Sequence, residues 1–113
     1  MQFFRPKPPA ISVRELKRLR DEGAEFTLID VRQPEERVIA TIGGVNIPLS
    51  ELPERLEELE AHRDRMIVVY CRSGVRSDSA ASYMISMGFS EVYNLEGGIL
   101  AWSARIDPTM PVY

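Results

Sequence analysis

The fold of this chain is decided by one stretch, Met66-Ile67-Val68-Val69-Tyr70-Cys71. It is the most hydrophobic run in the sequence, and none of its residues carries a charge. A strand that is apolar on both faces belongs in the middle of a parallel sheet, where helices cover both sides of it. We therefore predict that this stretch is the central strand of an α/β fold.

Strands and helices alternate on both sides of this stretch. Residues 26–31 form a second uninterrupted β-rich run, and Pro34 opens a short helix after it. Further short strands are expected near residue 10, over 45–47 and over 91–95. Apolar residues at helical spacing predict helices over 13–22, 52–59, 80–87 and around Trp102. This alternation is the pattern of a parallel sheet flanked by helices on both faces.

The length and composition indicate one globular domain. The chain has 113 residues, of which 44% are hydrophobic and 27% charged, and single domains commonly hold about 100 to 150 residues. We divide the sequence into a proline-rich extended leader over 1–10, a folded domain over 11–103 and an irregular tail over 104–113.

Charge, hydropathy and residue counts disfavour several classes of function. No apolar run approaches the ~20 residues that cross a bilayer, and the amino terminus lacks the apolar stretch of a secretory signal. The net charge is -3, with acidic and basic residues interspersed. This charge produces no positive field that would attract nucleic acid or a membrane surface. One cysteine and one histidine make an internal disulfide, a metal site or another cofactor improbable. We expect a cytoplasmic monomer.

The residues after the predicted central strand point to chemistry at Cys71. A lone cysteine is usually a small buried hydrophobe. Here, however, Arg72-Ser73-Gly74-Val75-Arg76 follow it directly before a helix, and such a loop can fold its amides around an anion. Gly74 permits backbone angles closed to other residues, and the helix start adds about half a positive charge. Both effects hold the pKa of a thiol below its usual range. Cys71 is therefore the candidate nucleophile.

Three segments together resemble the rhodanese family. The first is Leu28-Ile29-Asp30-Val31-Arg32 with Pro34-Glu35-Glu36, and the second is Val69-Tyr70-Cys71-Arg72-Ser73-Gly74-Val75-Arg76-Ser77. The third is Gly88-Phe89 followed by Asn94-Leu95-Glu96-Gly97-Gly98-Ile99 and Trp102. The match runs from about Ile11 to Trp102 in the expected order.

This resemblance implies a fold, a reaction and a site. The rhodanese fold has five parallel strands with helices on both sides. The implied activity is that of a thiosulfate sulfurtransferase: Cys71 accepts sulfane sulfur from a small anionic donor as a persulfide, then passes it to cyanide, a thiol or a sulfur-carrier protein. By the same resemblance, residues 72–76 bind the substrate, with Arg72 and Arg76 facing the sulfonate of thiosulfate. Asp30, Arg32 and Ser77 are supporting residues, and we interpret Asp30 and Arg32 as an ion pair or loop brace.

Two features qualify the resemblance. Ala40-Thr41-Ile42-Gly43-Gly44-Val45 stands where the family usually has Gly-His-Ile-Pro-Gly-Ala, so no histidine acts near that turn. Segment 95–102, Ile106-Asp107-Pro108 and the Pro-Val-Tyr ending look like the rhodanese domain of enzymes that adenylate and thiolate small sulfur-carrier proteins. An adenylated carrier for molybdopterin or thiamine synthesis is therefore a candidate acceptor.

Two other functions stay open at this point. Tyrosine and dual-specificity phosphatases also use a cysteine in an anion-binding loop that ends in arginine. Their loops place five residues between the two, whereas four separate Cys71 from Arg76. The second alternative is a rhodanese-like module that binds a partner without chemistry, although such modules usually lack the cysteine.

Overall fold

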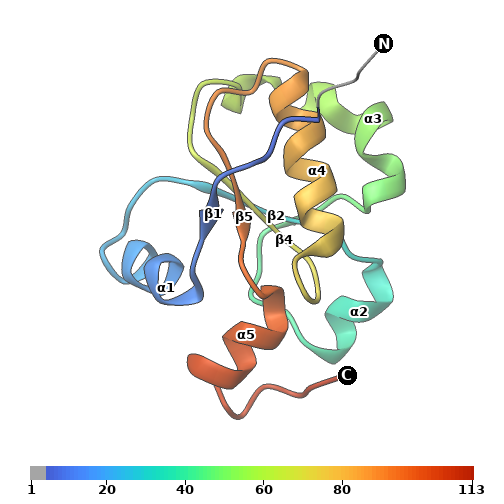
Figure 1. Ribbon diagram of the computed structural model, residues 1–113. Helices are drawn as coiled ribbons and strands as arrows, with labels where there is room; N and C mark the ends of the chain where they lie inside the picture. Colours follow the sequence, from blue (N-terminus) through green and yellow to red (C-terminus); the bar gives the residue numbers. More distant parts are fainter. Residues whose placement is uncertain (1–4) are drawn as a thin grey trace.

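The computed structural model describes residues 5–113 and shows an α/β fold (Figure 1). Its parallel sheet of five strands has the order β1-β5-β4-β2-β3. The strands are β1 (Ala10–Ile11), β2 (Thr27–Asp30), β3 (Val45–Asn46), β4 (Ile67–Tyr70) and β5 (Val92–Leu95). The α-helices are α1 (Val13–Asp21), α2 (Pro34–Ile39), α3 (Leu52–Arg55), α4 (Val75–Ser86) and α5 (Gly98–Arg105). Two 3₁₀ helices are η1 (Leu49–Glu51) and η2 (Leu56–His62).

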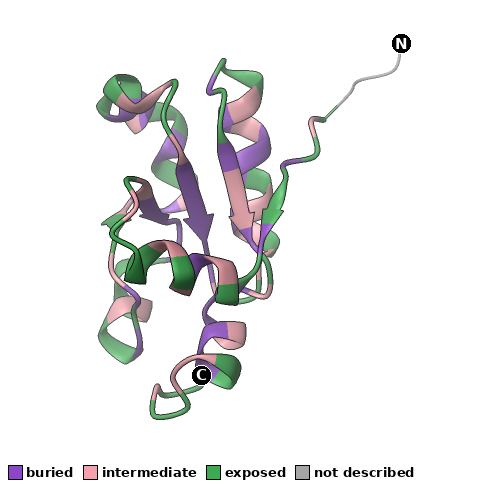
Figure 2. Ribbon diagram, turned by 90° about the vertical axis from the view of Figure 1, so that its left-hand side faces the viewer, coloured by how far each residue is buried: buried purple, intermediate pink, exposed green. Residues whose placement is uncertain are grey.

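Strand β4 is the middle strand of the sheet, as its sequence predicted. All four of its residues are buried, and Figure 2 shows the sheet interior as the most buried part of the molecule. Successive side chains of a strand point to opposite faces. Ile67 and Val69 accordingly pack into one apolar cluster, and Val68 and Tyr70 pack into the other.

The two clusters correspond to the two helix layers predicted from the sequence. Residues of α3, η2 and α4 form the cluster on one face, which also contains Cys71. Residues of α1 and α5 form the cluster on the other face, which contains Trp102. Helix α2 has no buried residue. In Figure 1 it lies near the lower edge, towards which the strands run.

Three predicted helices differ in detail. The helix expected over 80–87 begins earlier, because α4 starts at Val75 and includes the last two residues of the expected cysteine loop. The helix expected over 52–59 is a short α-helix followed by the 3₁₀ helix η2, and the three-residue step from Leu56 to Leu59 suits 3.0 residues per turn. Helix α5 continues to Arg105, two residues into the segment expected to be irregular. The rest of that segment contains a turn stabilised by the bond from the Met110 amide to the Asp107 carbonyl, at 3.0 Å.

The leader expected over 1–10 falls partly outside the described residues, which begin at Arg5. Residues 5–9 form neither helix nor strand, and Ala10 already belongs to β1. Within residues 5–113, no helix combines the length and apolar character needed to span a bilayer.

Candidate active site

Cys71 lies directly after β4, at the carboxyl edge of the sheet, where ligands bind in open α/β folds. Its residue exposure is only 1%. Three donors point at its sulfur: the Gly74 amide at 3.1 Å, the Ser77 amide at 3.4 Å and the Ser77 hydroxyl at 3.3 Å. The loop thus turns backbone and side-chain donors towards a single sulfur atom.

Glycines give the loop around Cys71 its shape. Gly74 has a φ of 105°, a left-handed conformation that favours glycine, and it precedes the first turn of α4. At the start of α5, the amides of Ile99 and Leu100 donate to the carbonyl oxygens of Cys71 and Arg72, at 3.0 and 3.1 Å. A Cβ atom on Gly98 would lie 2.5 Å from both of these oxygens. The start of α5 therefore holds the cysteine loop by two main-chain hydrogen bonds. Only a glycine at position 98 lets the two backbones come this close.

The Ser77 hydroxyl has one proton and two acceptors. It lies 3.3 Å from the Cys71 sulfur and 2.5 Å from Oδ1 of Asn94. The amide of Asn94 is oriented by its Nδ2, which donates to the Gly74 carbonyl at 3.1 Å. The Ser77 hydroxyl can therefore donate its hydrogen bond to the Cys71 thiolate, or rotate and donate it to Asn94 when Cys71 is uncharged.

Burial and hydrogen bonding act in opposite directions on Cys71. Burial raises the pKa of the thiol, but the Ser77 hydroxyl and the amides of Ser77, Gly74 and Ser73 outweigh it. The net pKa of Cys71 is therefore below its ordinary value. These donors therefore favour the thiolate form of Cys71 without a histidine base.

A Ser77→Ala variant will need a higher pH to ionise Cys71. The substitution removes one donor that favours the thiolate, so the pKa of Cys71 rises towards its ordinary value. The rate of alkylation by iodoacetamide, followed against pH, measures this change. Ser79→Ala, on the same helix but without a bond to the sulfur, should keep the wild-type profile. An identical profile for Ser77→Ala would show that the amides alone determine ionisation.

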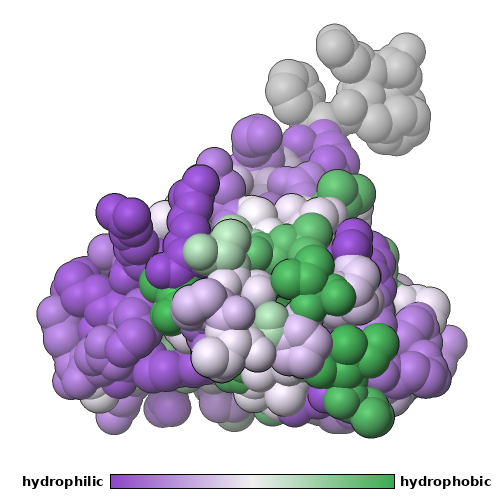
Figure 3. Space-filling model, turned by 90° about the horizontal axis from the view of Figure 1, so that it is seen from below, coloured by the Kyte–Doolittle hydropathy of each residue, from purple (hydrophilic) through white to green (hydrophobic). Residues whose placement is uncertain are grey.

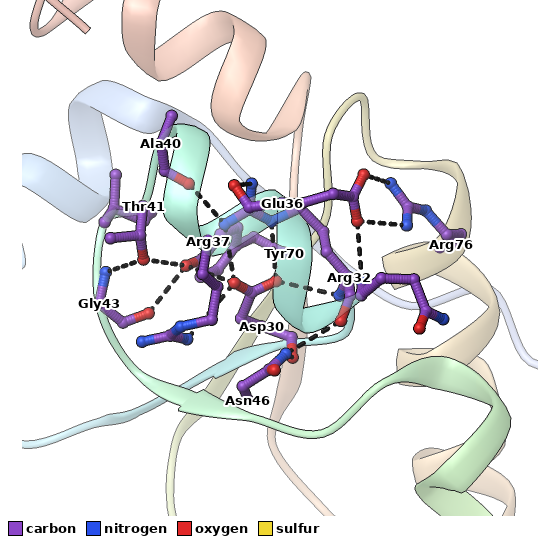
Figure 4. Close-up of polar contacts among 12 residues, drawn as sticks. Asp30, Arg32, Glu36, Arg37, Ala40, Thr41, Gly43, Asn46, Tyr70 and Arg76 are labelled. Carbon is purple, nitrogen blue, oxygen red and sulfur yellow. Dashed lines mark hydrogen bonds and ion pairs between the residues drawn. The ribbon is translucent and has the colours of Figure 1, made fainter. Parts of the chain in front are cut away.

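Asp30 and Arg32 form a fully buried ion pair at the end of β2. The carboxylate accepts from Nε and Nη2 of Arg32, at 2.9 and 2.8 Å (Figure 4). Burial opposes the charge of Arg32, but hydrogen bonds to Asp30 and Tyr113 and attraction to Asp30 raise its pKa. Arg32 also donates to the Ala40 carbonyl at 2.9 Å. The pair thus ties the end of α2 to the sheet. Neither Asp30 nor Arg32 is hydrogen-bonded to Cys71 within residues 5–113.

Helix α2 brings a carboxylate to the cysteine loop. Nη1 and Nη2 of Arg76 donate to Oε2 and Oε1 of Glu36, at 2.8 and 2.9 Å (Figure 4). The bond from Arg76 lowers the pKa of Glu36 against the effect of burial. Arg76, which the family resemblance assigns to the sulfonate, is therefore already in a bidentate ion pair.

Tyr113, at the end of the chain, contacts Arg32, Glu36 and Arg72. Its hydroxyl accepts from Nη1 of Arg32 at 2.7 Å and donates to Oε1 of Glu36 at 3.3 Å. The guanidinium of Arg72 lies 5.1 Å from the centre of the Tyr113 ring, which is within cation–π range. Among the described residues, Arg72 has no carboxylate partner. We call Glu36, Arg72, Arg76 and Tyr113 the mouth residues.

The structure brings most of the predicted site residues together, and it adds three that the sequence analysis did not assign. Cys71, Gly74 and Ser77 share one set of bonds, and the amide of Ser73 joins them. The added residues are Glu36, Asn94 and Tyr113. Glu36 and Asn94 stood in quoted motifs but had no role, and Tyr113 lay in a segment without periodicity. No local pattern in the sequence indicates their contacts with the cysteine loop.

The structure combines a parallel sheet, flanked by helices, with a lone cysteine at the carboxyl edge of that sheet. The loop after this cysteine directs backbone amides at its sulfur. The profile of the rhodanese-like domain matches residues 12–105. The chain therefore belongs to the family of rhodanese-like sulfurtransferases.

Relatives with one domain and with several resemble this chain. A sulfurtransferase of Allochromatium vinosum is 39% identical over 80 residues, which cover 70% of this chain and 73% of that protein. The human single-domain sulfurtransferase TSTD1 superposes with a TM-score of 0.75 at 30% identity, covering 86% of this chain and 96% of the other. The adenylyltransferase and sulfurtransferase MOCS3-1 of Zea mays is 39% identical over an alignment of 114 positions, which covers 96% of this chain. The chain spans only 24% of that maize protein.

Proposed function

We propose that this protein is a cytoplasmic sulfurtransferase that carries sulfane sulfur as a persulfide on Cys71. The Cys71 thiolate attacks the outer sulfur of thiosulfate, a sulfur–sulfur bond forms, and the bond to the sulfonate sulfur breaks with sulfite as the leaving group. Cyanide then attacks the outer sulfur of the persulfide, which yields thiocyanate and restores the thiolate. Each half-reaction balances without a redox cofactor.

The donor set around the Cys71 sulfur is the observation that carries this proposal. The Gly74 amide, the Ser77 amide and the Ser77 hydroxyl stabilise negative charge on the attacking thiolate. In this proposal the same donors also stabilise the negative charge of the persulfide. Sulfite is a good leaving group, so the step needs no general acid.

Intact-mass spectrometry after incubation with thiosulfate tests the proposal. The protein should gain one sulfur atom, and cyanide should remove it with release of thiocyanate. A parallel incubation with an aryl phosphate tests the phosphatase alternative. Rapid phosphate release with an unmodified Cys71 would overturn the sulfurtransferase proposal, and no change in either incubation would favour a binding module without chemistry.

Arg76→Ala should weaken thiosulfate use more than folding. The variant removes a positive charge beside the loop and leaves the Glu36 carboxylate free to repel the donor, so we expect KM for thiosulfate to rise about tenfold. The Arg76–Glu36 pair is partly exposed, so its loss should cost about 1 kcal/mol of unfolding free energy or less. Steady-state kinetics and urea unfolding measure the two effects.

Glu36→Gln is the matched control for this arginine. It removes the carboxylate but retains Arg76, so KM for thiosulfate should fall and not rise. Equal losses of stability and activity in Arg76→Ala would instead identify a structural arginine. An unchanged KM in both variants would remove Arg76 from the donor site.

A sulfur-carrier protein, adenylated at its carboxyl end, is the acceptor that we favour in the cell. The similarity to MOCS3-1, which covers 96% of this chain, supports this choice. The outer persulfide sulfur would attack the activated carbonyl carbon, forming a carbon–sulfur bond as AMP leaves. A thiol reductant would then cleave the sulfur–sulfur bond, becoming oxidised to its disulfide, and release the thiocarboxylate. Persulfidated protein that yields no thiocarboxylate from an adenylated carrier would count against this acceptor.

The cysteine loop gives little support to phosphoryl transfer. Four residues separate Cys71 from Arg76, which makes a shorter loop than a phosphatase uses. Arg76 directs both of its Nη atoms to Glu36. Phosphate and thiosulfate are both tetrahedral anions that would meet this ion pair, so the shorter loop is the feature that disfavours phosphoryl transfer.

A further inference from the structure

Asn94 connects two of the residues that donate to the Cys71 sulfur. It lies in β5, and its backbone amide donates to the Pro9 carbonyl at 2.9 Å. Its side-chain Nδ2 donates to the Gly74 carbonyl at 3.1 Å, and its Oδ1 lies 2.5 Å from the Ser77 hydroxyl oxygen. Strand β5 therefore holds one polar side chain against both the loop glycine and the buried serine.

The Gly74 carbonyl determines which way the Asn94 amide points. A carbonyl oxygen can only accept, so the group that faces it must be Nδ2. Oδ1 is then left facing the Ser77 hydroxyl, where it too can only accept. When Ser77 directs its proton to the sulfur, two oxygen atoms face each other at this short distance without a proton between them. Asn94 therefore favours the orientation in which Ser77 does not donate to Cys71.

The charge on the Cys71 sulfur decides how strongly it competes for the Ser77 proton. A thiolate attracts this proton across 3.3 Å. In the persulfide of the proposed function, the charge moves to the outer sulfur, ~2 Å further along the bond, and the attraction weakens. Ser77 is fully buried, and a buried hydroxyl without an acceptor is destabilising. Asn94 supplies an acceptor in the states with an uncharged Cys71 sulfur.

The bond between Ser77 and Asn94 lies beneath the surface that a donor meets. Cys71 is at the carboxyl edge of the sheet, on the face that Figure 3 views from below, where hydrophobic areas lie between hydrophilic ones. Ser77 is fully buried, so its hydroxyl is not part of that face. A change in the direction of this hydroxyl therefore alters the sulfur without altering the surface that a donor contacts.

We propose that Asn94 is a positioning residue that draws the hydrogen bond of the Ser77 hydroxyl away from the Cys71 sulfur whenever that sulfur loses its charge, and that it thereby balances the two half-reactions. The inference rests on the proposed function, in which Cys71 alternates between thiolate and persulfide. As the sulfur–sulfur bond forms and sulfite leaves, the hydroxyl rotates towards Asn94. When cyanide takes the outer sulfur, the electron pair of the sulfur–sulfur bond returns to Cys71 and the hydroxyl rotates back. The proton stays on the Ser77 oxygen throughout.

Asn94→Leu should change the two half-reactions in opposite directions. The variant removes the competing acceptor, so the Ser77 hydroxyl donates to Cys71 alone and the pKa of the thiol falls. A thiolate with a lower pKa is a weaker nucleophile and a better leaving group. At a pH where Cys71 is fully ionised, persulfide formation from thiosulfate should slow about threefold, and discharge to cyanide should accelerate about threefold. Single-turnover intact-mass spectrometry measures both rates, and alkylation by iodoacetamide against pH measures the ionisation.

The surroundings of Asn94 allow this variant to keep the loop. Asn94 lines a hollow of about 530 Å³ between residues 5–10 and the cysteine loop, so the branched leucine side chain has room. The Gly74 carbonyl loses its bond to Nδ2 but still accepts from the Asp78 amide at 3.1 Å. Damage to the loop would slow both half-reactions, whereas a change in the Ser77 hydrogen bond moves them apart.

Two further variants test the route through Ser77. Asn94→Asp keeps an acceptor and adds a negative charge, so Cys71 should ionise at a higher pH than in wild type. In Ser77→Ala, which has no hydroxyl, adding Asn94→Leu should change neither rate by more than about 1.5-fold. The mouth residues, which supply charged and titratable groups around the loop, are unchanged in each variant.

Asn46→Leu is the matched control. It makes the same substitution at the end of β3, where Nδ2 of Asn46 donates to the carbonyls of Asp30 and Arg32, each at 2.9 Å. The ratio of the two rates should stay that of wild type. Unchanged or equally slowed half-reactions in Asn94→Leu, or opposite changes that persist without the Ser77 hydroxyl, would overturn the proposal. Absence of any persulfide in wild type would instead overturn the proposed function, while the alkylation profiles would still test the hydroxyl.

Discussion

Cys71→Ser will gain no sulfur from thiosulfate, and its transfer of sulfur to cyanide will fall at least about 10⁴-fold. The chain has one cysteine, so the variant contains no thiol that could substitute. A serine hydroxyl is not ionised by the Gly74 and Ser77 donors at neutral pH, and it forms no persulfide. Intact-mass spectrometry and thiocyanate release measure the two losses.

The fold of Cys71→Ser should stay close to that of wild type. Cys71 contributes one small side chain to its apolar cluster, and a hydroxyl in its place still meets the donors around the sulfur. Urea unfolding with a similar midpoint would show that the loss is chemical. Residual sulfur uptake by the serine variant would mean that another group accepts sulfur, and the Cys71 mechanism would be wrong.

Asp30→Ala will cost about 3–5 kcal/mol of unfolding free energy. The substitution leaves the Arg32 guanidinium buried without its carboxylate, and Arg37 loses its contact of 3.4 Å with the same group. Since small domains are stable by about 5–15 kcal/mol in total, this variant should be largely unfolded at low urea concentrations. Urea titration followed by circular dichroism measures the change.

Asp21→Ala gives the comparison for the buried pair. Asp21 forms a salt bridge of 2.5 Å with Lys17, and both side chains are exposed. Its loss should cost less than about 1 kcal/mol, because water and salt screen an exposed pair. If Asp30→Ala also lowered the unfolding free energy by less than about 1 kcal/mol, the prediction would be wrong, and the buried pair would stabilise the fold no more than an exposed pair does.

The sequence predicts the framework of the fold because the framework depends on local patterns. The apolar run of β4 identified the middle strand, and Gly74 after Cys71 identified the loop that turns amides inwards. The apolar spacing over 13–22 predicted α1, and at its start the Glu15 amide donates to the Ser12 hydroxyl at 3.1 Å, as residues at capping-box spacing do. Each of these features acts over a few residues.

The mouth of the site could not be predicted in the same way. Glu36 and Arg76 are 40 positions apart, and Glu36 and Tyr113 are 77 apart. Charged and aromatic residues at such separations have no periodicity that pairs them, and many other pairings were open. Only the packing of α2 and the tail against the end of the sheet selects these contacts.

The donors to the Cys71 sulfur have a consequence for how such a domain can diverge. Two of these hydrogen bonds come from backbone amides, those of Gly74 and Ser77, and a backbone amide remains a donor when neighbouring side chains change. Mutation can therefore change Arg72, Ser73 or Val75 while two of the donors to the sulfur remain. Main-chain donors in the loop therefore maintain the reactivity of the thiolate, while substitutions of the loop side chains can change which substrate is bound.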